Sequence, residues 1–468
     1  MNYGGLAGPY IRFDPMVAKS FSGFLWLGAT WIDGTIGGSS VSRLTTTGTP
    51  GIAFTTSSSA RLSTVGGSCS PTIDKGLIAV GPEGPNSSNE RMYINWIEGG
   101  PTHGRMYIRR SNMTNDPVGG TPPGTEWNEN PVEFVPAAPT TPCVTSGFAP
   151  IAVVARFASV DPGRIVVAYS PSEVSGLYQP VRVTTSPPGG QQWLATPPTL
   201  AEAASGSPGQ NETIKGFDPS DVWNGYEIRM FPSIASDPTN PDVIYVVFSG
   251  SNDLESNPNQ NVDLYIARGV LTGNQTTPIT FDPLETLRLH DATLGTASDA
   301  DQGMPAVTVD DCGQIHITYY NLRNDATLGV RVRARMVTIP NFTASTQPAC
   351  LNRDLAPEFS PVDITNGTKP PGRELGDYLW VDSDGCFVYP IFVCGHEGQT
   401  RIYMGKIQTW PGCRADVDED CYTGTLDFAA FAIAYAACDP EADVNKDSVV
   451  DAQDLTDFLT DYLAGGGP

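Results

Sequence analysis

The sequence predicts a mainly β fold of six repeated units, followed by a small helical segment. Short runs rich in Val, Ile, Tyr and Phe alternate with turns rich in Asp, Pro, Asn and Gly, which is typical of antiparallel strands. The clearest unit spans residues 229–268. Its central apolar run recurs six times at intervals of 67 to 79 residues, beginning at Leu25, Met92, Ile165, Ile244, Ile315 and Phe387. Self-similarity at a nearly fixed period indicates a repeat architecture.

The repeats predict a β-propeller. A small sheet cannot bury both of its faces alone, so neighbouring copies must stack on it. Radial stacking of four-stranded copies gives a propeller. We therefore predict a six-bladed β-propeller over residues 1–411, with blades near 10–58, 73–135, 148–200, 229–287, 301–364 and 375–407. The last copy is one strand short. An array of ordinary β-sandwiches is the alternative.

Composition limits the classes of partner. The chain has 468 residues, a net charge of −24 and only 17% charged residues. This balance argues against nucleic acid or an anionic membrane as the main partner. No run of apolar residues is long enough for a transmembrane helix, so no membrane span is expected.

The nine cysteines indicate an oxidising compartment. Cys69 and Cys143 precede the first strands of adjacent copies, so we predict a disulfide between them. Further predicted pairings are Cys312 with Cys350 and Cys413 with Cys438. We therefore expect an extracellular, secreted protein whose signal peptide is not part of the given sequence.

Two predicted hairpins carry a degenerate form of a known motif. The segments are SPPGGQQW (Ser186–Trp193) and GTPPGTEW (Gly120–Trp127). They keep the Gly and Trp of the Asp-box but lack its Asp. With the blade pattern, residues 10 to 410 resemble the sialidase-like propeller superfamily. The resemblance implies a carbohydrate-active protein: either an exo-sialidase-like glycoside hydrolase or a non-catalytic propeller that binds glycan or protein. The family's Phe/Tyr-Arg-Ile-Pro motif is missing, so no catalytic residue is assigned.

A ligand site is expected at the mouth of the propeller channel, where the first strands begin. The polar residues that enter these strands are Asp74, Lys75, Arg229, Asp301, Gln302, Asp377 and Tyr378. Their mixed acids and bases are suited to binding a sugar or an ion. The four histidines fit no catalytic triad or zinc spacing. His316 lies within a predicted strand, where we expect a packed or hydrogen-bonded side chain.

Residues 412–468 form a second, acidic module. Residues 413–468 hold 13 acidic side chains against Arg414 and Lys446. Two segments align at a spacing of 27 residues, beginning at Asp416 and Asp443. Their oxygen-bearing residues recur as in an EF-hand loop, which suits Ca²⁺. The predicted ligands are Asp416, Asp418, Asp420, Tyr422 and Asp427 in the first loop, and Asp443, Asn445, Asp447, Val449, Asp451 and Asp454 in the second. Tyr422 and Val449 would contribute carbonyl oxygens. The first loop has Gly424 where the second has Asp451.

A helix is predicted after each loop. The expected apolar faces are Phe428, Phe431, Ala432, Tyr435 and Ala436 in the first helix, and Leu455, Phe458, Leu459, Tyr462 and Leu463 in the second. The duplicated loop and helix resemble a type I dockerin. This resemblance implies two calcium sites and a cohesin-like protein partner. The residues that it places against the partner are Thr425, Leu426, Ala452 and Gln453.

Overall fold

The computed structural model describes parts of the whole chain. These are residues 11–19, 25–33, 36–46, 52–60, 72–82, 90–99, 105–110, 132–135, 151–153, 162–169, 181–187, 193–194, 199–201, 232–250, 263–274, 276–289, 302–325, 329–340, 342, 351–355, 362–363, 379–385, 387–396, 399–409, 415–417, 423–439, 442–445 and 449–465. In several strands, including all four of the first sheet, little beyond the backbone is described.

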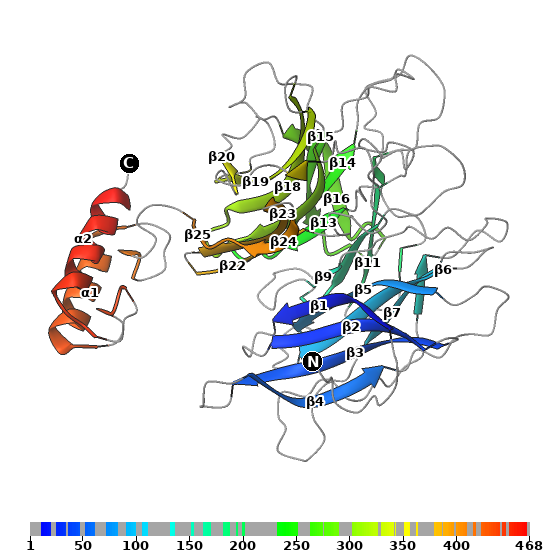
Figure 1. The fold of residues 1–468 in the computed structure, drawn as a ribbon, viewed down its shortest axis with the longest axis horizontal. Coiled ribbons are helices and arrows are strands. Elements are labelled where there is room, and N and C mark those ends of the chain that lie inside the picture. Colours follow the sequence, from blue (N-terminus) through cyan, green and yellow to red (C-terminus); the bar gives the residue numbers. More distant parts are fainter. Residues whose placement is uncertain are drawn as a thin grey trace.

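The described strands form six antiparallel sheets that follow one another along the chain (Figure 1). The first sheet contains β1 (Ile11–Lys19), β2 (Leu25–Asp33), β3 (Ile36–Thr46) and β4 (Ile52–Ala60). The second contains β5 (Thr72–Pro82), β6 (Glu90–Gly99), β7 (Arg105–Arg110) and β8 (Val132–Val135). The third contains β9 (Ile151–Val153), β10 (Ile165–Tyr169), β11 (Val181–Ser186) and β12 (Thr199–Ala201).

The remaining three sheets repeat the same meander. The fourth contains β13 (Ser233–Ser236), β14 (Val243–Gly250), β15 (Asp263–Leu271) and β16 (Ile279–Leu289). The fifth contains β17 (Gln302–Val309), β18 (Ile315–Asp325), β19 (Gly329–Ile339), β20 (Leu351–Asp354) and β21 (Val362–Asp363). The sixth contains β22 (Trp380–Asp384), β23 (Phe387–His396), β24 (Gln399–Met404) and the short β25 (Ile407–Gln408). The prediction of a mainly β fold is confirmed.

First strands of successive sheets lie side by side. β1 contacts β5, β5 contacts β9, β9 contacts β13, β13 contacts β17, and β17 contacts β22. Within the first four sheets the following strands lie progressively further from these contacts, because neighbours in sequence are neighbours in the ladder. In the fifth sheet, β20 and β21 both pair with β19. The sixth sheet differs, since β25 pairs with β23 rather than adding a strand beyond β24. Among the described residues, no strand pairs with the outer edge of β24.

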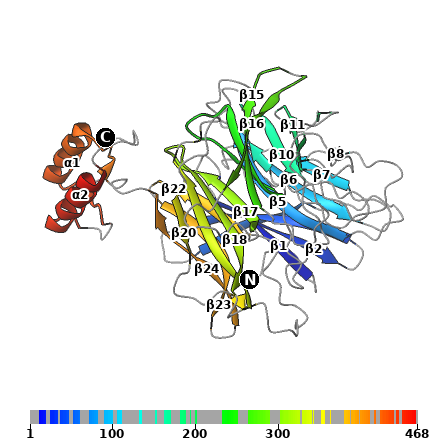
Figure 2. The same cartoon turned by 90° about the horizontal axis from the view of Figure 1, so that it is seen from above.

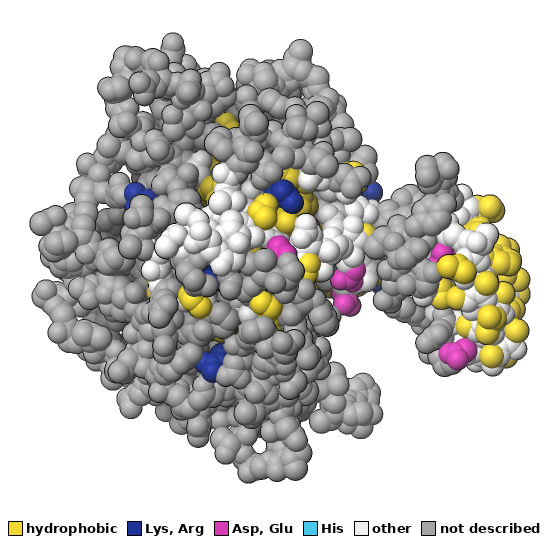
Figure 3. Space-filling view, turned by 180° about the vertical axis from the view of Figure 1, so that it is seen from behind, with side chains coloured by type: hydrophobic (Ala, Val, Ile, Leu, Met, Phe, Trp, Pro, Cys, Tyr) yellow, Lys and Arg dark blue, Asp and Glu magenta, His cyan; other side chains and the backbone are white. Residues whose placement is uncertain are grey.

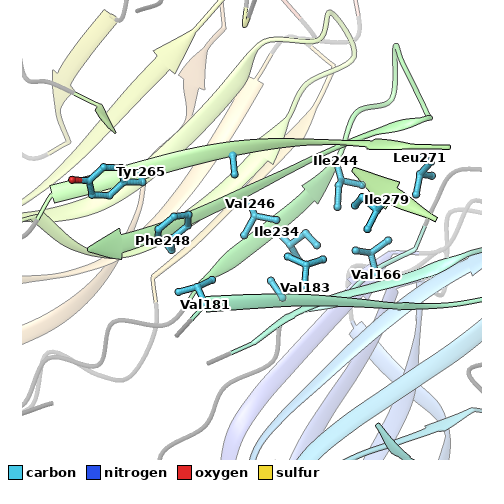
Figure 4. Close-up of a cluster of buried hydrophobic side chains, with 12 residues drawn as sticks. Val166, Val181, Val183, Ile234, Ile244, Val246, Phe248, Tyr265, Leu271 and Ile279 are labelled. Carbon is cyan, nitrogen blue, oxygen red and sulfur yellow. The ribbon is translucent and has the colours of Figure 1, made fainter. Parts of the chain in front are cut away.

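The core consists of layers between adjacent sheets. Ile244, Val246 and Phe248 of β14 face the third sheet and pack with Val166 and Val183 (Figure 4). The alternate residues of β14 face the fifth sheet. Since successive side chains of a strand point to opposite faces, a strand between two sheets is apolar on both. This explains the uninterrupted run VIYVVF, all of it buried.

An aspartate closes the turn after the first strand in two sheets. Asp237 accepts hydrogen bonds from the backbone N–H groups of Thr239 (2.9 Å) and Asn240 (3.0 Å) and from the Tyr245 hydroxyl (3.2 Å). Asp310 repeats the arrangement in the fifth sheet. One carboxylate oxygen therefore holds the turn, and the other holds a buried side chain of the second strand.

His316 occupies the position in the fifth sheet that Tyr245 has in the fourth. Its Nε2 lies 3.0 Å from Asp310 Oδ2, and its Nδ1 lies 3.0 Å from Thr338 Oγ1. The side chain is fully buried. The expectation of a packed, hydrogen-bonded His316 is confirmed.

Alkaline pH is expected to destabilise the fourth sheet through Tyr245. Burial, reinforced by the charge of Asp237, raises the pKa of Tyr245 from 10.0 to about 12. The folded protein therefore retains a proton that the unfolded chain releases. The resulting stabilisation is complete below pH 10 and is lost as the pH rises to about 12. At most it amounts to about 2–3 kcal/mol.

The measurement is urea unfolding at a series of pH values across this window for the wild type and Tyr245→Phe. We expect the wild type to lose more stability with rising pH than the variant, because phenylalanine does not titrate. Parallel losses in the two proteins would show that Tyr245 is not the responsible group. Comparison with the variant cancels the contributions of the other tyrosines.

Helices are found among the described residues only near the C-terminus. They are α1 (Thr425–Ala437) and α2 (Ala452–Gly465). Figures 1 and 2 show both helices standing to one side of the sheets. None of the described helices is long and apolar enough to cross a membrane.

Candidate functional site

The predicted channel-mouth residues are only partly described. Asp74 and Lys75 lie in β5, where the structure gives the backbone, and Gln302 is the first residue of β17. Arg229, Asp301, Asp377 and Tyr378 lie outside the described residues. Their convergence on one site therefore stays a prediction.

Three first strands are irregular close to their beginnings. The register shifts between Phe13 and Pro15 in β1, between Asp74 and Leu77 in β5, and between Gly303 and Ala306 in β17. Bulges re-aim side chains and are common next to functional sites. In β17 the shift includes Met304, whose φ of 53° lies in the left-handed region. This conformation is strained for a residue with a side chain.

Gln302 connects two sheets. Its side chain is buried, and its Oε1 accepts a hydrogen bond from the backbone N–H of Leu264 in β15 (3.3 Å). A residue that we predicted to line the channel mouth thus reaches from the fifth sheet to the fourth. The sequence does not indicate this role, because its partner is a backbone group 38 residues away.

The acidic module places two carboxylates in equivalent settings. Asp427, in the first turn of α1, accepts hydrogen bonds from the backbone N–H groups of Val417 (2.7 Å) and Gly424 (2.6 Å). Asp454, in the first turn of α2, accepts them from Asn445 (3.2 Å) and Asp451 (2.8 Å). Both carboxylates are buried. In each repeat, one carboxylate therefore ties the loop to the helix that follows.

Asp454 is held as an anion. Burial acts to raise its pKa, but hydrogen bonds from the backbone N–H groups of Asp451, Asn445 and Val444 outweigh this effect, so the pKa is lowered. A buried carboxylate that stays ionised attracts a cation. Sequence spacing identified this residue, but not its burial.

The other predicted calcium ligands vary in exposure. Asp416, Asp443 and Asn445 are partly buried, whereas Val449 and Asp451 are exposed. Asp418, Asp420, Tyr422 and Asp447 lie outside the described residues. Within the described part, no three His, Cys, Asp or Glu side chains form a metal-binding group. The donor set of carboxylate, amide and carbonyl oxygens is nevertheless the set that Ca²⁺ prefers.

The two repeats share one small core. Phe431 of α1 and Phe458 of α2 stack with ring centroids 3.9 Å apart and planes at 3°. Ala415 and Ala442, which directly precede the two loops, complete the fully buried set. Each pair is separated by the repeat spacing, so equivalent residues of the repeats meet at the centre of the module.

The predicted helix faces are partly wrong. Leu463 is 79% exposed, and Ala432 and Ala436 are also exposed, while Ala434 packs against the core. Among the described elements, α1 and α2 pack against each other through one shared core. Each helix therefore buries only part of its apolar surface.

The module presents an exposed apolar surface (Figure 3). Its large members are Leu426, Phe428, Ile433, Val449 and Leu463. The residues predicted to contact a partner, Thr425, Leu426, Ala452 and Gln453, are all exposed. Exposure is what a docking role requires, but it does not identify the partner.

One disulfide prediction is wrong. Cys438 is a free, exposed thiol, so it is not bonded to Cys413. It follows the last residue of α1 in a left-handed conformation, with φ of 53°. Cys312 is disulfide-bonded, in line with its predicted involvement in a bridge. Its predicted partner Cys350, and the predicted pair Cys69 and Cys143, lie outside the described residues.

The degenerate Asp-box hairpins are described only at their edges. Ser186 ends β11, and its hydroxyl donates to the backbone carbonyl of Pro187 (3.1 Å). Trp193 is partly buried. Gly120, Gly124, Trp127 and Gly190 lie outside the described residues.

Known structures offer distant similarities. An α-L-arabinofuranosidase of Fusarium graminearum, solved with arabinobiose, has 8% identity and a TM-score of 0.46, covering 85% of this chain and 93% of that one. An α-L-arabinanase of Penicillium chrysogenum, also with arabinobiose, has 12% identity and a TM-score of 0.40, covering 74% and 95%. An endo-arabinanase of Bacillus licheniformis has 11% identity and a TM-score of 0.29, covering 69% and 93%. No protein-family model and no curated protein matches the sequence.

Proposed function

We propose that this chain is a secreted, carbohydrate-active, six-bladed β-propeller that attaches to an assembly through a calcium-dependent, dockerin-like module. The propeller part is supported by six successive meanders whose first strands lie side by side. Closing the ring requires a further contact between the sixth sheet and the first. A glycan is the ligand or substrate, and the cohesin-like partner contacts the module.

The equivalent settings of Asp427 and Asp454 carry the attachment proposal. Two carboxylates are buried against backbone N–H groups at the repeat spacing, which supports the same role for both of them in the two loops. In a calcium-loaded loop, these anions would balance part of the charge of the ion. Asp416 and Asp443, the first residues of the two loops, would supply further oxygen ligands.

Removing calcium is expected to release both helices. The core of the module is small, and small modules usually need a metal or disulfide for stability. Hydrogen exchange of the full chain, read by mass spectrometry before and after chelation, distinguishes the module from the sheets. We expect faster exchange in α1 and α2 and no change in β10, β14 and β18. Unchanged exchange in the helices would contradict the calcium proposal.

Single substitutions measure the contribution of each loop to calcium binding. Asp454→Ala is expected to weaken calcium binding more than Asp427→Ala, because the second loop also offers Asp451 where the first has Gly424. Titration calorimetry of the full chain measures both affinities. Asp457→Ala, which removes a carboxylate from the same helix outside the predicted ligands, is the control. Equal losses in all three variants would show only a nonspecific charge effect.

A glycan panel tests the propeller. It contains neutral arabino-, xylo- and cello-oligosaccharides together with acidic sialyllactose and oligogalacturonate. Binding is measured by calorimetry, and hydrolysis is measured by the release of reducing ends. Cleavage supports a glycoside hydrolase, with sialoside cleavage required for sialidase-like specificity. Binding without cleavage supports the non-catalytic alternative, and neither result contradicts the proposal of a carbohydrate ligand. Absence of binding and cleavage would contradict it.

A further inference from the structure

The layer between the fourth and fifth sheets changes from apolar to polar at one end. Val243, Tyr245 and Val247 of β14 face the fifth sheet, and Ile315, Ile317 and Tyr319 of β18 face the fourth. The pairing of β14 with β15 and of β18 with β19 contains no register shift, so side chains along β14 and β18 alternate regularly between the two faces. Two residues further along each strand, the same faces carry Ser249 and Asn321.

Gln302 brings these two polar residues together. Ser249 pairs in register with Leu264, and Asn321 pairs in register with Gln302. The hydrogen bond from the Leu264 N–H to Gln302 Oε1 joins the two pairs across the layer. Ser249, Gln302 and Asn321 therefore surround one location, which we name the polar seam.

The polar seam contains buried hydrogen-bonding atoms for which the described part of the chain offers no partner. Ser249 and Asn321 are each 1% exposed. Ser249 Oγ and both Oδ1 and Nδ2 of Asn321 are buried without a partner among the described residues. Each such atom costs about 1–3 kcal/mol if it stays unpaired. Three at one location indicate that another molecule supplies the missing donors and acceptors.

The position of the polar seam relates it to the proposed glycan site. Gln302 begins β17, one of the strands that lie side by side, and it enters at the same end as Asp74 does in β5. The strained Met304 and the register shift follow directly. Strained residues of this kind cluster at active and ligand-binding sites, where the surrounding structure holds them in place.

The chemistry of the polar seam fits a neutral polyol. A primary amide and a hydroxyl each offer both a donor and an acceptor, which is what sugar hydroxyl groups require. On the same face of β19, Arg333 and Arg335 contact the two oxygens of Asp354 at 3.4 and 2.9 Å. Ser249, Gln302 and Asn321 themselves carry no charge.

We propose that Ser249, Gln302 and Asn321 form a subsite for the hydroxyl groups of a neutral sugar at the end of the layer between the fourth and fifth sheets. This inference rests on the proposed carbohydrate function and names the chemical class of the ligand. It assigns discrimination between neutral and acidic sugars to side chains that the sequence did not single out, apart from Gln302.

The test compares Asn321→Leu and Ser249→Ala with Thr318→Val. Thr318 lies in the same strand, is fully buried and also has an unpaired hydroxyl, but it faces the sixth sheet. Calorimetry uses the neutral oligosaccharide from the panel that the wild type binds most tightly. We expect Asn321→Leu to weaken binding about tenfold to a hundredfold, because a buried sugar hydroxyl loses its partners. Ser249→Ala should weaken binding less, and Thr318→Val should leave it unchanged.

The outcomes separate this inference from the function on which it rests. Wild-type affinity in both seam variants would show that the sugar does not contact the polar seam and would overturn the subsite alone. An equal loss in Thr318→Val would show that the effect is structural and would also overturn it. Preferential binding of the acidic probes would overturn the neutral class. Failure of the wild type to bind any glycan would overturn both proposals. Ser249→Ala, which removes a single atom, keeps the test valid if Asn321→Leu does not fold.

Discussion

Replacing Phe458 with alanine is expected to disrupt the C-terminal module and leave the sheets intact. The ring is fully buried and stacks on Phe431, and it also contacts Phe428 and Tyr462. Truncating a buried phenylalanine costs about 3–5 kcal/mol. A core this small rarely supplies more than about 3–5 kcal/mol in total. The variant therefore loses most of the stability that side-chain packing provides.

Hydrogen exchange of the full chain in saturating calcium measures the effect. We expect exchange in α1 and α2 to speed up by about a hundredfold to several thousandfold, which corresponds to the same free energy. Leu463→Ala is the matched control, because it truncates a large apolar residue of the same helix that is 79% exposed. Protection in Phe458→Ala equal to that in Leu463→Ala would mean that the two rings do not hold the helices together.

Replacing Asp310 with alanine is expected to have the largest effect within the sheets. Its carboxylate contacts His316 Nε2 and accepts the backbone N–H groups of Cys312 (3.0 Å) and Gln314 (2.8 Å). The variant leaves three donors without an acceptor, one of them in a fully buried ring. Breaking a buried network by removing one partner costs about 3–5 kcal/mol.

Urea unfolding measures this loss, with two comparisons. Asp311→Ala removes the neighbouring, exposed carboxylate and should lower the free energy of unfolding much less than Asp310→Ala does. Asp310→Asn keeps one oxygen as an acceptor for the turn and should recover part of the stability. A loss in Asp310→Ala no larger than that in Asp311→Ala would contradict the role assigned to Asp310.

The sequence predicted those features that local pattern controls. Alternating apolar runs between turn residues identified strands, because side-chain direction in a strand has a period of two. The run VIYVVF is one of these apolar runs, and it is buried on both faces. In the module, the spacing of 27 residues related Asp427 to Asp454 and Phe431 to Phe458 before any contact was known. These features depend on neighbouring residues or on a repeated spacing, so they can be recognised in the sequence itself.

The predictions were wrong where the burial or bonding of a residue depended on which other residues pack against it. Leu463 has the apolar character of a core residue, but no described element covers it, so it stays exposed. Cys438 was predicted to pair with Cys413, whereas the thiol at the end of α1 is free. Helix periodicity predicts the direction of a side chain, but it does not predict how much of the helix surface another element covers.

The sequence by itself therefore determined the β character, the repeat period and the positions of the acidic loops, since each follows from local residue pattern. Only the tertiary structure decided that Gln302 bonds to Leu264 and that Ser249 and Asn321 lie together with unpaired polar atoms. Ser249 lies more than fifty positions before Gln302 and Asn321. In the sequence, Ser249 and Asn321 are ordinary polar residues at the ends of apolar runs. Whether a polar side chain is buried, and whether it finds a hydrogen-bond partner, depends on the residues that pack against it. Both are therefore decided only when two sheets pack together.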